Sequence, residues 1–165
     1  MGNGTSVFGD LVRGGLAGAA GTWVMDQVTT AMASAQSADI TAQEERAQPN
    51  GQSSIANLVD RVASATGTEL SDEQKSRVSQ VVHYGLGVVP GAIFGVLRRR
   101  LPLVGAAGGL FYGFLVWALN DEYLNTQLGL SAAPDAYPPE THWRGLVGHL
   151  VLGATTNSGI DALGG

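Results

Sequence analysis

The chain has 165 residues, the size of one domain, and only 14% of them are charged, whereas about a quarter are charged in a typical soluble domain. A net charge of −5 without a basic stripe argues against nucleic acid as a partner. The chain contains no cysteine, which excludes disulfides, thiolate nucleophiles and cysteine-ligated zinc. Most of the 24 glycines lie inside apolar runs, where they would weaken a soluble helix but are common in transmembrane helices.

Four apolar segments, taken in chain order, predict an all-α membrane bundle of about four transmembrane helices that forms a single domain over residues 1–165. They cover residues 11–35, 78–97, 101–119 and 143–156. A helix needs about 20 mostly apolar residues to cross the hydrocarbon core, which the second and third segments provide. The first and fourth segments are weaker candidates, because they are rich in Gly, Ala and Thr.

The polar stretch after the first segment contains an amphipathic helix, which we predict over residues 53–67. Gly67 is placed to end this helix. Ser71 and Gln74 have the spacing of a capping box and would start the helix that continues into the second segment. The amphipathic helix would lie on the membrane surface or cap the bundle. Its apolar residues recur at helical spacing, at Ile55, Leu58, Val59, Val62 and Ala63.

The turn between the second and third segments carries three consecutive arginines, Arg98, Arg99 and Arg100. Short loops that are rich in arginine stay on the cytoplasmic side of a membrane. The turn therefore predicts a multi-pass membrane protein with both termini in the cytoplasm. Two other interpretations stay open. The first segment could be a cleaved signal peptide, and a mean hydropathy of +0.10 also allows a soluble helical protein.

Glycines recur at four-residue spacing on three of the segments, so each of these segments carries a stripe of small residues. Close backbone approach through such stripes drives the association of transmembrane helices. Packing within one bundle and an interface between copies both fit the pattern. The partners we expect are the lipid bilayer and either a homo-oligomer or a larger membrane complex. The stripes consist of Gly14 and Gly18, of Gly87, Gly91 and Gly95, and of Gly105, Gly109 and Gly113.

The acidic residues and histidines that we single out as site candidates lie within the predicted spans or at their ends: Asp26, His83, Asp121, His142 and His149. Ionisable residues at membrane depth are costly and are candidates for a functional site. In the predicted topology, Asp26, His83, Asp121 and His142 converge near the outer surface. Such a group could form hydrogen bonds between helices, a proton or ion path, or a shell for a divalent metal such as Zn, Mn or Fe.

Three functional hypotheses follow from these residues. The first is a small ion or proton pathway, or a transport-related protein. The second is a structural or accessory subunit whose glycine stripes dock onto a larger membrane complex, and the third is a metal-dependent membrane enzyme. The sequence has no phosphate-binding loop and no nucleophile elbow, so we predict no catalytic residue and expect an enzyme least.

Three short stretches in the second half of the chain carry a family resemblance. The first is a span that begins with a histidine and ends in a basic hairpin, residues 83–100. The second is a Gly/Ala-rich span at 105–119 with a Gly-Leu-x-x-x-Pro loop at 129–134, and the third is Gly-His-Leu-Val at 148–151. Together they resemble the YagU-type family of bacterial inner-membrane proteins. The resemblance implies a multi-pass inner-membrane location, supplies no mechanism, and singles out the histidines of the first and third stretches.

Overall fold

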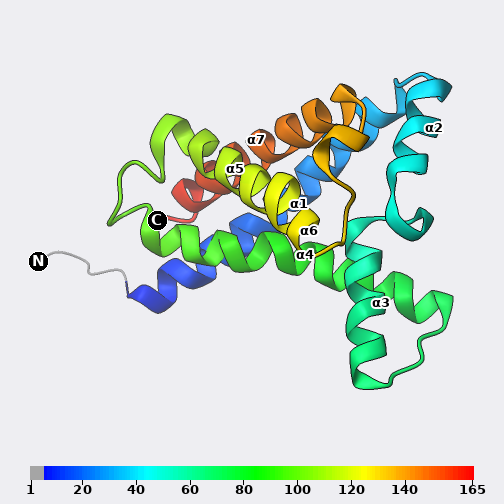
Figure 1. Ribbon diagram of the computed structural model, residues 1–165. Helices are drawn as coiled ribbons and strands as arrows, with labels where there is room; N and C mark the ends of the chain where they lie inside the picture. The colour runs from blue at the N-terminus through cyan, green and yellow to red at the C-terminus, as the bar shows by residue number, and fades with distance from the viewer. Residues whose placement is uncertain (1–5) are drawn as a thin grey trace, which may run out of the picture.

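The computed structural model describes residues 6–165, so the predicted cytoplasmic N-terminus lies outside the described residues. Within them the secondary structure is helical and contains no strand, which confirms the all-α prediction. Three long helices run alongside one another, α1 (Val7–Ser34), α4 (Asp72–Leu97) and α7 (Pro139–Ala162). Helix α1 packs against both α4 and α7, as Figure 1 shows.

A fourth helix packs on α7 and is built from three consecutive pieces. Helix α5 (Leu110–Val116) continues into the π-helical segment η3 (Trp117–Leu124), and α6 (Asn125–Gln127) follows without a break. The predicted helix start at residue 101 is wrong. The chain turns after Pro102 and forms the short 3-10 segment η2 (Ala106–Gly109), in which three consecutive residues have positive φ. These left-handed residues delay the helix to Leu110.

Two short helices, α2 (Ala38–Ala47) and α3 (Ser54–Thr66), cross one end of the bundle (Figure 1). The 3-10 segment η1 (Pro49–Gly51) joins them. The amphipathic helix predicted over residues 53–67 is thus confirmed, and it ends at Gly67 with φ of 65°. The predicted capping box of Ser71 and Gln74 is also present at the start of α4.

Polar side chains attach α3 to the bundle. Asn57 is buried and donates from Nδ2 to the Leu130 carbonyl at 3.0 Å, in the loop that leads to α7. Lys75 of α4 lies 2.6 Å from Asp60 Oδ2, which also accepts from Gln52. The hydrogen bonds from Lys75 and Gln52 hold the pKa of Asp60 below its usual value. Helix α3 therefore acts as a cap held by hydrogen bonds and one ion pair.

The predicted glycine stripes of α1 and α4 face each other inside the bundle. A Cβ added at Gly14 or Gly18 would overlap the carbonyl oxygens of Gly91 and Gly87. In the reverse direction, a Cβ at Gly91 would lie 2.7 Å from the Gly14 carbonyl oxygen, and one at Gly95 would overlap the backbone of α1. The two backbones therefore touch directly, as close packing between small residues requires.

The stripe of α5 packs on α7 in the same way. A Cβ at Gly113 would overlap the His149 carbonyl oxygen, and one at Gly109 would overlap that of Gly153. Gly105 does not take part, which corrects the prediction for this residue. It precedes the helix, and its nearest neighbour across space is the Arg98 side chain, 3.5 Å from an added Cβ. The other glycines of the three predicted stripes form close contacts between helices of the same chain.

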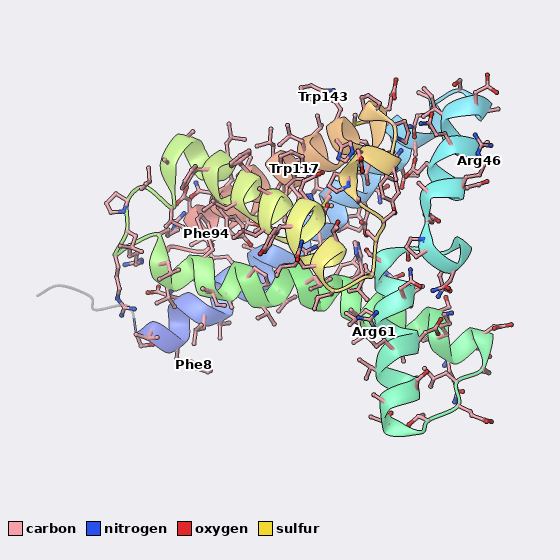
Figure 2. All side chains as sticks on the ribbon, in the orientation of Figure 1. Phe8, Arg46, Arg61, Phe94, Trp117 and Trp143 are labelled. Atoms are coloured by element: carbon pink, nitrogen blue, oxygen red, sulfur yellow. The ribbon has the colours of Figure 1, made fainter. Side chains whose placement is uncertain are left out.

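Many large apolar side chains point away from the bundle. Phe8 is 74% exposed and Trp143 is 62% exposed, whereas Phe94 is fully buried (Figure 2). Other exposed apolar residues are Leu16, Trp23, Val81, Val89 and Ile93. The interior contains apolar residues, among them Phe94, Tyr112, Leu152 and Ile160, together with polar and charged ones, among them Asp10, Thr22, His149 and Thr156. An exposed apolar surface of this extent is unusual for a soluble domain of this size.

One helix among residues 6–165, Asp72–Leu97, is long and apolar enough to cross a membrane by length and composition. The predicted set of four spans is therefore not confirmed. Helix α1 has the length, but Asp10, Arg13 and Asp26 lower its apolar content. Helix α7 likewise carries Arg144, and its last two turns are largely polar and include Asp161. What is confirmed is the helical class, not the number of spans.

Candidate functional site

All three histidines of the chain pair with carboxylates. Two of the pairs join the π-helical segment η3 to α7, and the third joins α1 to α4. None of these residues is a sequence neighbour of its partner, so the fold itself brings each pair together. The pairs are His83 Nε2 with Asp26 Oδ1 at 2.7 Å, His142 Nδ1 with Glu122 Oε1 at 2.7 Å, and His149 Nδ1 with Asp121 Oδ2 at 3.5 Å.

The π-helical segment η3 positions two consecutive carboxylates on α7. Asp121 reaches His149, and Glu122 reaches His142, which lies about two turns earlier on the same helix. π-helical turns are rare and are frequently found at functional sites. The stretch Trp117–Leu124 has no glycine or proline that marks it as irregular in sequence. The π-helix was therefore not predicted.

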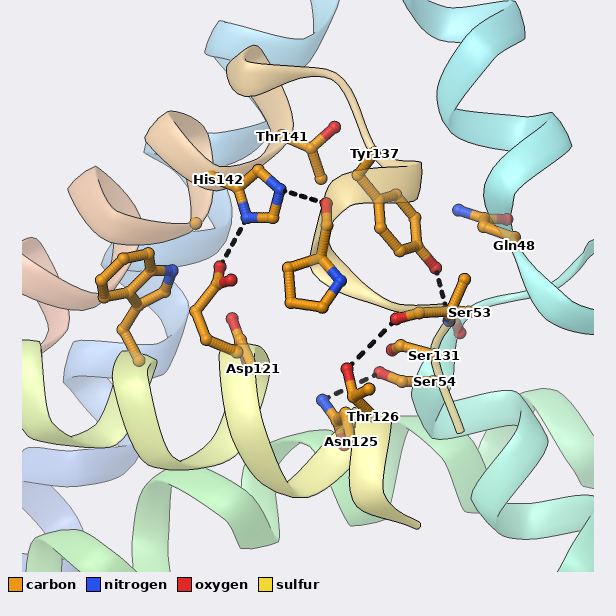
Figure 3. A pocket seen from close by; sticks show the side chains of 15 residues that line it. Gln48, Ser53, Ser54, Asp121, Asn125, Thr126, Ser131, Tyr137, Thr141 and His142 are labelled. Atoms are coloured by element: carbon orange, nitrogen blue, oxygen red, sulfur yellow. Dashed lines mark hydrogen bonds and ion pairs between the residues drawn. The ribbon is translucent and has the colours of Figure 1, made fainter. Parts of the chain in front are cut away.

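The contacts of His142 favour its protonated form. Its Nδ1 faces the Glu122 carboxylate, and its Nε2 lies 2.9 Å from the Pro134 carbonyl oxygen, beside the short segment η4 (Pro134–Ala136) (Figure 3). Both partners accept, so both ring nitrogens donate. Burial lowers the pKa of His142, but the hydrogen bonds to Glu122 and Pro134 outweigh it, and the pKa lies above its usual value.

A cavity of about 210 Å³ opens beside His142, and we call it the end cavity (Figure 3). It lies between α3, the π-helical segment η3 and the start of α7. Asp121, Glu122, His142 and Tyr137 line it. Trp117 Nε1 and Thr141 Oγ1 belong to lining residues as well, and both atoms are buried without a hydrogen-bond partner in the described part of the chain. The end cavity is therefore rich in polar groups.

A second cavity of about 390 Å³ lies among α1, α3, α4, η3 and α7, and we call it the inner cavity. Most of its wall is apolar and includes Leu58, Leu86, Leu124, Leu152 and Pro90. Its polar lining residues include His83, His149, Asn120 and Asp121. Asp121 lines both cavities, as do Ser54 and Asn125. The Asp121 carboxylate thus stands between the two.

The opposite end of the bundle is basic and closely packed. Arg98 binds Asn157 and Asp161 near the end of α7, and Arg13 donates to the Leu163 carbonyl at 2.9 Å. Arg99 lies 3.4 Å from the buried Asp10. Between this end and the histidines, the rings of Phe94 and Tyr112 stack with centroids 4.3 Å apart.

The structure brings together some of the predicted site residues and separates others. Asp26 meets His83, and His149 meets Asp121, but His142 pairs with Glu122. Glu122 was not among the candidates, because in sequence only its position beside Asp121 marks it. No group of three metal-ligating side chains is found among residues 6–165. The predicted convergence of four of the candidates into one metal shell is therefore corrected to separate pairs.

Comparison with known proteins gives no relative: no family model, no curated protein and no solved structure matches the chain. The resemblance to the YagU-type family stays a prediction. Function is therefore inferred from the geometry of this chain.

Proposed function

We propose that the chain is a multi-pass protein of a bacterial inner membrane and that its histidine–carboxylate pairs carry protons or small ions, directly or as part of transport. The observation that carries the proposal is an apolar outer surface combined with ionisable pairs between the helices. Each histidine and its carboxylate lie between helices, while many large apolar side chains face outward. A lipid environment favours this arrangement, because inward-facing ionisable residues are the ones a membrane tolerates.

The membrane part of the proposal rests on the two faces of α1. Its outer face carries Phe8, Leu11, Val12, Leu16 and Trp23, all exposed. Its inner face carries Gly14, Gly18 and Thr22, together with the buried Asp10. Hydropathy averaged over the whole helix includes the inner face and so understates how apolar the outer face is. An exposed apolar surface of this kind marks contact with lipid or protein.

The arginines support an orientation for the proposed bundle. Arg13, Arg98 and Arg99 meet at the end opposite α3, with Arg100 in the same turn. The helices α2 and α3 cross the other end. Under the positive-inside rule, the arginine end would face the cytoplasm.

The proton or ion path rests on the order of the pairs. His83, Asp121 and His149 border the inner cavity, Asp26 lies behind His83, and Glu122–His142 borders the end cavity. Imidazole and carboxylate groups exchange protons at physiological pH, and three such pairs beside two cavities that share Asp121 could form a short relay. Pro90 in the cavity wall removes one backbone hydrogen bond of α4, which gives that helix a place to flex.

The accessory-subunit hypothesis loses its main support. It depended on glycine stripes that remain free to dock. Gly14, Gly18, Gly87 and Gly91 close onto one another, and Gly113 closes onto α7. A partner would have to bind through large exposed side chains instead.

Insertion into a membrane is testable with single cysteines, since the chain has none. Ile93→Cys on the exposed face of α4, Ser64→Cys on α3 and Arg100→Cys in the turn would be treated with a water-soluble maleimide in intact cells and in detergent. We expect position 93 to react only in detergent, position 64 to react from the periplasm, and position 100 to react only once the membrane is opened. Labelling of position 93 in intact membranes contradicts the proposal.

Transport is testable in proteoliposomes that hold an imposed pH gradient. We expect proton flux from the wild-type protein, strongly reduced flux from Asp26→Asn and His83→Ala, and unchanged flux from the matched variant Asp39→Asn, whose carboxylate is exposed on α2. Equal flux from all four proteins, or no flux above empty liposomes, contradicts the pathway.

A further inference from the structure

The inner cavity has the size and lining of a site for a small organic molecule. Its volume of about 390 Å³ falls in the range of about 300–1,000 Å³ found for ligand pockets. Such pockets are mostly apolar with a few placed polar groups. In the inner cavity, leucines come from α3, from α4, from the loop that follows α6 and from α7. The leucines are Leu58, Leu86, Leu128, Leu130 and Leu152.

The two histidines of the inner cavity offer lone pairs to a ligand. His149 Nδ1 lies 2.9 Å from the Gly145 carbonyl oxygen, which can only accept, so this nitrogen carries the hydrogen. In the neutral ring, Nε2 is then an acceptor. His83 Nε2 likewise donates to the Asp26 carboxylate, which leaves Nδ1 as the acceptor of its neutral ring. Neither free nitrogen has a hydrogen-bond partner within residues 6–165.

Asp121 is the carboxylate at this cavity that lacks a close cation. Its Oδ1 accepts from the Asn120 amide at 2.8 Å, and His149 Nδ1 is 3.5 Å from Oδ2 but donates to Gly145. By contrast, the Glu122 carboxylate has the His142 imidazole at 2.7 Å. The Asp121 side chain is 34% exposed and lines both cavities, so a cation can approach it from either one.

We propose that the inner cavity binds a small amphipathic amine in its ammonium form. The N–H groups would donate to Asp121 and to the free imidazole nitrogens, and the hydrocarbon part would lie among the leucines. Asp121 would repel an anion. A neutral alcohol would leave the charge of the Asp121 carboxylate uncompensated. A small amphipathic amine would then be the substrate class of the proposed transport function, on which this inference rests.

The route to the site leads through the end cavity. Asp121, Ser54 and Asn125 line both spaces, and the Asn125 amide meets Ser54 Oγ at 3.5 Å, at the limit of a hydrogen bond. An amine arriving from the end cavity would therefore pass a weak contact and meet Asp121 first.

The test is isothermal titration calorimetry on the full chain in detergent or nanodiscs, with three probes of one size. They are 2-phenylethylammonium, 2-phenylethanol and 3-phenylpropionate. We expect the ammonium ion to bind at least tenfold more tightly than the other two. Asp121→Asn should weaken it at least tenfold, and the matched variant Asp39→Asn should leave it unchanged. Leu58→Trp, which fills the cavity from α3, should abolish binding while the thermal unfolding transition is kept.

The proposal is overturned if the alcohol binds as tightly as the ammonium ion or if no probe binds. It is also overturned if the ammonium ion binds at full strength to Asp121→Asn or to Leu58→Trp. If Asp121→Asn does not fold, Leu58→Trp and the three probes still decide the matter. The measurement uses no membrane gradient. Binding without proton flux would refute the proposed pathway and leave the amine site standing, and flux without binding would do the opposite.

Discussion

The Asp26 carboxylate and the His83 imidazole meet at 2.7 Å although 57 residues separate them in sequence. The contact joins α1 to α4 on the same side as the contact between Gly18 and Gly87, farther from the arginine end. Two helices that touch backbone to backbone leave room for only short polar side chains between them. The register set by the glycines therefore decides which carboxylate meets which histidine.

The Asp26–His83 pair should be energetically coupled. Asp26→Leu or His83→Leu leaves the other polar group without its partner, and each should lower the free energy of unfolding by about 1–3 kcal/mol. The double variant should lose less than the sum of the two single variants, because it leaves no orphaned group. Chemical denaturation in detergent measures all four proteins. Strictly additive losses would show that the pair does not interact.

Two glycines of α4 should respond in opposite ways to alanine. A Cβ at Gly87 would overlap Thr22 Oγ1, a buried hydroxyl that is bound to the Gly18 carbonyl, so Gly87→Ala should destabilise by about 1–3 kcal/mol. No neighbouring atom lies within 4 Å of a Cβ at Gly85, so Gly85→Ala should be neutral or stabilising by about 0.5–1 kcal/mol. Thermal unfolding of both variants checks this, and equal transitions would contradict the described helix contact.

Glu122 should control the titration of His142. The pKa of His142 is raised in the folded protein, so its contribution to stability is complete below the unfolded pKa of about 6.5 and is lost as pH rises through the folded pKa. Glu122→Gln should lower that pKa, seen by NMR of the imidazole. The unfolding temperatures of variant and wild type should differ more at about pH 5.5 than at about pH 9.

The control for this prediction is Glu140→Gln, an exposed carboxylate in the first turn of α7. It should leave the His142 titration in place. A gap between Glu122→Gln and wild type that widens toward alkaline pH would reverse the assigned sign and contradict the pair.

Asn57 should hold the cap formed by α3. Its amide donates to the Leu130 and Pro49 carbonyls, and its oxygen accepts from Asn50 at 2.8 Å. Asn57→Ala should cost about 1–3 kcal/mol because buried carbonyl and amide groups lose their partners. Amide hydrogen exchange should then speed up in α3 and leave α1 protected. Ser64→Ala, at an exposed position of α3, should change neither, and unaltered exchange in Asn57→Ala would contradict the role.

Periodicity and local signals predicted the fold well where one helix or one turn decided the outcome. The apolar spacing from Ile55 to Val62 and the position of Gly67 predicted α3, and Ser71 with Gln74 predicted the start of α4. The glycine spacing in α1 and α4 predicted a close contact, because only small residues permit one. The helix boundaries depend on neighbouring residues alone, whereas the glycine spacing predicted a close contact without naming its partner helix.

Features that depend on backbone irregularity were not predictable. The left-handed run through Ala107 and Gly109 moved the helix start and removed Gly105 from the interface. The π-helical segment turned Glu122 toward His142, which no spacing rule for an α-helix indicates. Five of the six residues in the histidine–carboxylate pairs were named from the sequence, whereas their pairing required the path of the chain.

The two ends of the bundle differ in how tightly they are fastened, and this sets where the molecule can move. At the arginine end, Arg98, Arg99 and Arg13 tie α4, α1 and the end of α7 together around closely packed backbone. At the other end, α3 is attached by the polar contacts of Asn57, Lys75 and Arg61 and by the buried Val59. Tilting of α3 would break those contacts but no backbone contact between glycines, so a movement of the molecule would meet less resistance at α3 than at the arginine end.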